Sequence, residues 1–115
     1  MSRDDRDLLD DILARIHLTT EFVQGDHSRF MQSRLVQEAV IRNLEVIGEA
    51  ARNISDALCE RYPDVPWREI AAFRNFAIHV YWGLKFERVW QIIDEDLPRL
   101  KTQVEAILRD LHADG

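Results

Sequence analysis

Apolar residues recur at every third or fourth position along most of the chain, which is the spacing of helices with one buried face. No stretch alternates apolar and polar residues in the way that a half-exposed β-strand does. The chain has only four glycines and three prolines, which leaves long uninterrupted segments. The pattern therefore predicts an all-α fold, an antiparallel bundle of four to five helices that forms a single domain over residues 1–115.

The first half of the pattern predicts two long helices. One covers residues 4–23, and the sequence QGDHS ends it, with Gly25 as the stop and Ser28 as a possible N-cap of the next element. After a short turn, a second helix covers residues 33–61, because its apolar positions keep helical spacing throughout.

The second half is divided by prolines and by Gly83. The two prolines of YPDVPW end the second helix, and a third helix starts near Pro66 and reaches about residue 80. The last helical segment covers residues 84–111, where Pro98 predicts either a kink or a new start with proline in the first turn.

Composition and charge limit the kinds of partner. The net charge is −6, so a nucleic-acid role would need a local basic site or two sites brought together. Thirteen of the 15 basic residues are arginines, whose forked guanidinium suits phosphate, although a compositional preference for arginine explains this equally well.

No apolar run approaches the ~20 residues that cross a bilayer, and the N-terminus lacks a signal-peptide core. The single Cys59 fits a reducing compartment, so we expect a cytoplasmic protein.

The sequence predicts neither a metal nor a cofactor. None of the four histidines follows a glutamate by three residues, the ligand spacing of di-iron bundles. His17 and Glu21 share one face of the first helix, but two ligands do not make a metal site. The chain also lacks a glycine-rich phosphate loop and a serine nucleophile elbow.

The segment FRNFAIHVYWG, residues 73–83, sets polar residues among apolar ones. On a helix Asn75 and His79 lie one turn apart on the same face, and the long side chain of Arg74 can converge on the same ligand. A structural interpretation is equally concrete: Arg74 pairs with an acidic residue, Asn75 caps a helix, and His79 is a hydrogen-bonded core residue.

This segment resembles the Arg-x4-His-x-Tyr motif of the HepT family, the toxins of the HEPN superfamily. The segments AVIRNLEVIGEAARNIS (39–55), YPDVPWREIAAFRN (62–75) and VWQIIDEDLPRLK (89–101) are similar to the family's other recurrent segments, in the same order. The resemblance covers nearly the whole chain except the N-terminal helix. It implies an all-α domain that forms a homodimer, and a metal-independent endoribonuclease toxin of a type II/VII-like toxin–antitoxin system. It also implies an antitoxin partner, an MntA-type minimal nucleotidyltransferase that attaches AMP to the motif tyrosine, Tyr81.

The residue types suit this chemistry, because RNA supplies its own nucleophile, the 2′-hydroxyl. We expect His79 to move a proton near neutral pH and Arg74 to hold the non-bridging phosphate oxygens. Asn75 would orient His79 or contact the phosphate or ribose. By resemblance Tyr81 is the site of AMPylation, whereas as a structural residue it would pack near Trp82.

A second polar stripe, Arg42, Glu45, Glu49 and Arg52, lies on one face of the second helix. These residues most simply form ion pairs within the helix, but Arg42 and Glu49 could instead brace the site. The small residues beside them, Gly48, Ala50 and Ala51, would let another helix approach closely, either within the chain or across a dimer.

Two departures from the family pattern bear on Tyr81. Val80 stands where the family often has glycine, and Lys85 stands where an acidic residue often follows. Both leave Arg74 and His79 unchanged, but they affect the surroundings of Tyr81. Two other functions remain open: a non-catalytic nucleotide-binding or interaction partner of a minimal nucleotidyltransferase, and a purely structural helical dimer.

Overall fold

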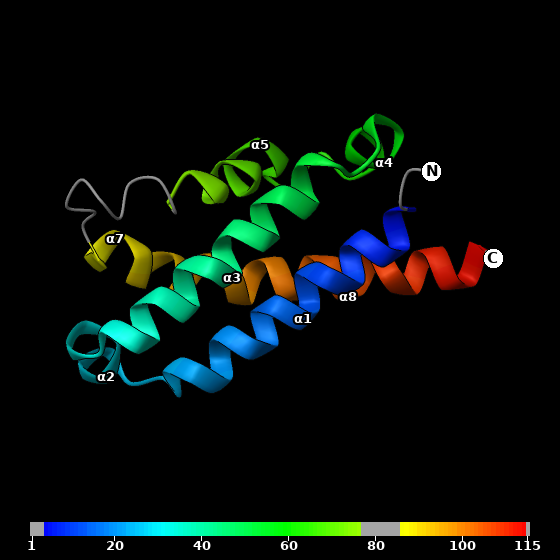
Figure 1. Ribbon diagram of the computed structural model, residues 1–115. Coiled ribbons are helices and arrows are strands. Elements are labelled where there is room, and N and C mark those ends of the chain that lie inside the picture. Colours follow the sequence, from blue (N-terminus) through cyan, green and yellow to red (C-terminus); the bar gives the residue numbers. More distant parts are fainter. Residues whose placement is uncertain (1–3, 77–85, 115) are drawn as a thin grey trace.

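The computed structural model describes residues 4–76 and 86–114, and all regular structure in these ranges is helical (Figure 1). The elements are α1 (Asp5–Val23), α2 (His27–Gln32), α3 (Arg34–Arg52), α4 (Asp56–Arg61), α5 (Trp67–Ala71), a 3₁₀ turn (Ala72–Asn75), α7 (Phe86–Gln91), a π-helical stretch (Ile92–Asp96) and α8 (Leu97–Asp114). The prediction of an all-α fold is confirmed. No helix in the described ranges is both long enough and apolar enough to cross a membrane.

Helix α3 is the centre of the bundle. It packs along α1 on one side and against α5 and the 3₁₀ turn on the other, while α8 lies against α1 (Figure 1). Each of these helices turns an apolar stripe inward, as the spacing of the sequence requires. The fully buried side chains include Leu9, Ile12, Val40, Leu44, Ile47, Ile92, Val104 and Ile107.

The junction between α1 and α2 differs in detail from the prediction. Helix α1 ends with Gln24 in the left-handed region at φ 54°, followed by Gly25 at φ 66°, so the predicted stop is confirmed. The predicted N-cap at Ser28 is wrong. Asp26 caps α2, and its carboxylate accepts a hydrogen bond from the backbone N–H of Arg29 at 3.0 Å. Aspartate is as good an N-cap as serine, and Asp26 comes first after the turn.

The predicted uninterrupted helix over residues 33–61 is also wrong, because α3 ends at Arg52 and α4 begins at Asp56. Ser55 caps α4 by accepting a hydrogen bond from the N–H of Leu58 at 3.2 Å. Its own N–H and hydroxyl both donate to the carboxylate of Asp5 on α1, at 2.9 and 2.6 Å. The break is therefore stabilised by a side chain 50 residues away, which the local apolar spacing cannot reveal.

We expect Ser55→Ala to lower the free energy of unfolding by about 1 kcal/mol, because the change removes both the cap of α4 and the hydroxyl donor to Asp5. Denaturant unfolding measures this loss. Ser55→Thr is the matched control, since it keeps a hydroxyl at the same position. If Thr destabilised the protein as much as Ala, the cap would not be the cause.

Pro98 is the second residue of α8, but the predicted alternative of a new helix start at this proline is wrong, because no break in the helix precedes it. The helix that carries it is continuous with α7 through the π-helical stretch, in which the N–H of Leu97 donates to the carbonyl of Ile92 five residues earlier. Helices α7 and α8 thus form one long run beneath α3 and α5 (Figure 1).

Candidate functional site

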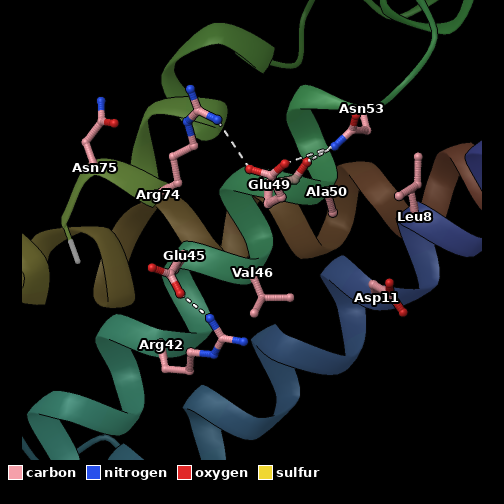
Figure 2. Close-up of a pocket in the computed structure, with 10 residues that line it drawn as sticks. All are labelled: Leu8, Asp11, Arg42, Glu45, Val46, Glu49, Ala50, Asn53, Arg74 and Asn75. Atoms are coloured by element: carbon pink, nitrogen blue, oxygen red, sulfur yellow. Dashed lines mark hydrogen bonds and ion pairs between the residues drawn. The ribbon is translucent and has the colours of Figure 1, made fainter. Parts of the chain in front are cut away.

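An open pocket of about 600 Å³ lies where α1, α3 and the 3₁₀ turn meet (Figure 2). We call it the α1–α3 pocket. Its charged and polar lining includes Asp11 from α1, Arg42, Glu45 and Glu49 from α3, and Arg74 and Asn75 from the turn. The pocket therefore gathers four of the residues that the sequence singles out for the site or its support.

Helix α3 presents three of these side chains on one face, because Arg42, Glu45 and Glu49 are three and then four residues apart. Arg42 forms an ion pair with Glu45 inside the helix, as the simplest prediction had it. Glu49 makes a different contact. Its Oε2 accepts a hydrogen bond from Nη1 of Arg74 at 3.3 Å, across the pocket from α3 to the turn (Figure 2).

Gly48 lets the turn approach α3 this closely. A Cβ atom built on Gly48 would lie 2.6 Å from the backbone nitrogen of Arg74 and 2.9 Å from the carbonyl oxygen of Ala71. Real Cβ atoms essentially never come within 3.0 Å of another heavy atom, so any side chain here would push the turn away. The small residue predicted to permit a close approach does so within the chain.

The short turn also separates its own side chains. A 3₁₀ helix has three residues per turn, so Phe73 and Phe76 lie on the same side, with ring centroids 6.3 Å apart. Arg74 points toward Glu49, whereas Asn75 points away from this ion pair (Figure 2). Asn75 thus borders the α1–α3 pocket without contacting either Arg74 or Glu49 in the view.

The Arg74–Glu49 pair is exposed to water. The two side chains are 38% and 54% exposed, and ion pairs of this kind contribute no more than about 1 kcal/mol to stability. A guanidinium has five N–H donors, and the bond to Glu49 uses one of them. Among residues 4–76 and 86–114, Arg74 is therefore held by one weak bond, and its other donors make no hydrogen bond to these residues and can face an anion in the pocket.

The α1–α3 pocket is not basic by itself. Two guanidinium groups, Arg42 and Arg74, face three carboxylates, Asp11, Glu45 and Glu49. This balance agrees with the overall charge of −6 and with the expectation that two sites must come together to attract a polyanion. Asp11 and its neighbour Leu8 were missed by the sequence reasoning, because they lie on the N-terminal helix that has no recognisable motif.

The remaining predicted site residues, His79 and Tyr81, lie outside the described residues, as do Val80 and Lys85. Within residues 4–76 and 86–114, no group of three or more His, Cys, Asp or Glu side chains is arranged to hold a metal ion. The structure thus brings Arg42, Glu49, Arg74 and Asn75 together around one pocket, and the positions of His79 and Tyr81 remain predictions.

Comparisons with known proteins identify the family. A family model described as ribonuclease HepT-like matches residues 12–107. A protein of Methanocaldococcus jannaschii named "Putative RNase MJ1380" is 40% identical over 106 residues, which cover 91% of this chain and 97% of that protein. The "Probable ribonuclease HepT" of Thermococcus cleftensis is 39% identical over 108 residues, which cover 93% of this chain and 98% of its own. No solved structure gives a significant match. The matched region includes α3 and the turn with Arg74, and the chain belongs to the HepT-like ribonuclease family.

Proposed function

We propose that this protein is a metal-independent endoribonuclease that cleaves RNA by attack of the 2′-hydroxyl on the adjacent phosphodiester. The observation that carries the proposal is the placement of Arg74 in a chain of this family. Its guanidinium lies at the edge of an open pocket, on a turn pressed against α3 at Gly48. The names of the relatives, which describe ribonucleases, support the same reaction class.

The proposed chemistry assigns one task to each group. Negative charge builds up on the non-bridging oxygens of the phosphate in the transition state, and the donors of Arg74 would bind these oxygens. His79 would take the proton from the 2′-hydroxyl or give a proton to the leaving 5′-oxygen, since imidazole titrates near neutral pH. Asn75 would orient the histidine or the substrate. The products would be a 2′,3′-cyclic phosphate and a 5′-hydroxyl end.

The charge balance of the α1–α3 pocket supports a homodimer. One pocket carries more carboxylates than guanidinium groups, so one copy has little attraction for RNA. A second copy that turned its own Arg74 and His79 into the same cleft, and its carboxylates away from it, would double the guanidinium and proton-transfer groups there without doubling the negative charge. Glu49 would keep Arg74 of each copy in position, and Glu45 would do the same for Arg42.

The proposed biological role is that of a cytoplasmic toxin neutralised by an MntA-type nucleotidyltransferase antitoxin. Transfer of AMP to Tyr81 would place a phosphate and a bulky adenosine two residues from His79. The added negative charge and volume would exclude the RNA backbone. Mass spectrometry of the protein co-expressed with such an enzyme would detect AMP on Tyr81, and Tyr81→Phe is the matched control.

Cleavage of a defined single-stranded RNA in EDTA tests the reaction directly. We expect the wild type to produce 2′,3′-cyclic phosphate ends without added metal, and His79→Ala to lower the rate at least a hundredfold, because general acid–base catalysis contributes about 10²–10⁴. A requirement for divalent metal would overturn the mechanism. Tight binding to a nucleotidyltransferase together with no cleavage at high protein concentration would instead favour the non-catalytic alternative.

A further inference from the structure

A second pocket lies on the other side of the 3₁₀ turn from Glu49. It has a volume of about 370 Å³ and is bounded by α5 and the turn on one side and by α7, the π-helical stretch and α8 on the other. We call it the α5–α8 pocket. Phe73 and Phe76 reach it from the same turn that carries Arg74 into the α1–α3 pocket. Because consecutive Cα atoms are only about 3.8 Å apart, the turn is a thin ridge between the two pockets.

The floor of the α5–α8 pocket is apolar and partly aromatic. Ile92 and Leu100 are buried in the core, and Phe73 and the partly exposed Phe76 form a tilted ring pair with an interplanar angle of 42°. A volume of about 370 Å³ is within the usual range of small-molecule pockets, roughly 300–1,000 Å³. The pocket thus offers a flat apolar ring surface in a space suited to a small planar group.

Two arginines stand on the rim, Arg88 on α7 and Arg99 on α8. Both are exposed, and neither has a carboxylate within ion-pair distance among the described residues. Glu69 and Asp96 also reach the rim, so the pocket as a whole is not strongly charged. A rim that carries both charges would repel a long run of phosphates. Its two arginines can bind one or two phosphates, and its two carboxylates can accept hydrogen bonds from other groups of the same ligand.

We propose that the α5–α8 pocket is a subsite for a nucleotide of single-stranded RNA that flanks the cleaved bond. The base would pack on Phe76, Arg88 and Arg99 would bind the phosphates on either side of it, and Glu69 or Asp96 would accept from amino or hydroxyl groups. This inference rests on the proposed ribonuclease function, because the flanking nucleotide would lie across the 3₁₀ turn from Arg74, where the cleaved phosphate is proposed to bind. Stacking on aromatic rings combined with arginine contacts to the backbone is how proteins hold single strands without reading a long sequence.

Binding to a non-cleavable RNA tests the subsite without depending on catalysis. The probe is a fluorescent decanucleotide with 2′-O-methyl groups, and its dissociation constant is measured over a series of salt concentrations. In the double variant Arg88→Ala/Arg99→Ala, the slope of log Kd against log salt should fall by about 1.4, since each phosphate contact to a single strand contributes about 0.7. Phe76→Leu keeps the apolar volume but removes the ring, and it should weaken binding about tenfold.

The matched control is Arg68→Ala/Arg109→Ala, which removes the same charge from exposed positions that line neither pocket. It should leave the slope within about 0.3 of the wild type. Cleavage kinetics give an independent readout, because a subsite that binds substrate and transition state equally affects KM and not kcat. We expect the Arg88/Arg99 double variant to raise KM about tenfold with kcat unchanged within twofold. Thermal unfolding of each variant verifies that the fold is intact.

The outcomes separate the subsite from the proposed function. If the wild type cleaves RNA in an Arg74-dependent manner while the Arg88/Arg99 variant behaves like the Arg68/Arg109 control, the proposed subsite is rejected and the proposed ribonuclease function is supported. If the wild type binds the decanucleotide with the expected dependence on Arg88 and Arg99 but never cleaves RNA, the subsite stands as a binding site and the ribonuclease is wrong. If the variant instead loses only the binding of a partner protein, the pocket is a protein-docking site and the inference fails.

Discussion

Replacement of Arg74 by alanine is expected to lower kcat for RNA cleavage by about 10²–10³-fold, the usual effect of removing one preorganised donor that faces developing negative charge. The fold should be preserved. Within the described part of the chain, the ion pair that is lost is the one with Glu49, and its exposed partners contribute no more than about 1 kcal/mol to stability. Single-turnover cleavage of a short RNA and denaturant unfolding measure the two effects separately.

Two control variants isolate the role of the guanidinium. Arg74→Lys keeps the charge but loses the fork that binds two phosphate oxygens, so its rate should fall between those of the wild type and the alanine variant. Glu49→Gln removes the charge partner of Arg74 without touching Arg74 itself, so it should change stability as little as Arg74→Ala does while retaining most of the cleavage. An alanine variant at position 74 that cleaved RNA as fast as the wild type would remove Arg74 from the mechanism.

Replacement of Gly48 by alanine is expected to destabilise the protein, although the same change in the middle of an ordinary helix stabilises it by up to about 1 kcal/mol. The added methyl group would collide with the nitrogen of Arg74 and the carbonyl of Ala71, which are backbone atoms and cannot rotate away. Overpacking of this kind costs about 1–3 kcal/mol. Displacement of the turn by about 1 Å would also move Arg74 and should lower kcat about 10²-fold. Thermal unfolding and cleavage rates measure both losses.

Gly25→Ala is the matched control for Gly48→Ala. Gly25 has φ +66°, and no atom lies within 4 Å of the position that a Cβ would occupy. Alanine there should cost about 1 kcal/mol through backbone strain alone and should leave cleavage unchanged. Equal loss of activity in the two variants would show that general destabilisation, and not the position of Arg74, limits the rate.

The sequence predicts the helical class and the outer boundaries well, because these depend on apolar spacing and on local stop signals such as Gly25. The sequence pattern fails to predict a helix boundary where a residue far away in the chain stabilises that boundary. Ile54 and Leu58 keep the helical spacing, so the pattern continues through residues 53–55, and the carboxylate of Asp5 that stabilises the break is 50 residues away. Ser55 followed by Asp56 is nevertheless an N-cap signal, and it could have suggested the start of α4.

The site was predicted only in part, for the same reason. The stripe on α3 correctly gives the Arg42–Glu45 pair, since both residues lie on one helix. The partner of Glu49 is 25 residues further along the chain, and only the packing of the turn at Gly48 reveals it. That Arg74 pairs with an acidic residue was the structural alternative for this arginine. The exposed pair satisfies that interpretation, and it remains compatible with the proposed binding of phosphate.

The π-helical stretch between α7 and α8 has a consequence for how chains of this family can differ in length. A π turn holds one residue more than an α turn, so Ile92–Asp96 is a place where an α-helix has absorbed an additional residue. A relative that lacked one residue here could form a plain α-helix and keep the axis and the facing of both flanking segments. In an alignment of relatives, gaps within the continuous helix of α7 and α8 should therefore concentrate at Ile92–Asp96. A deletion there would leave Arg88 and Arg99 on the same side of the helix.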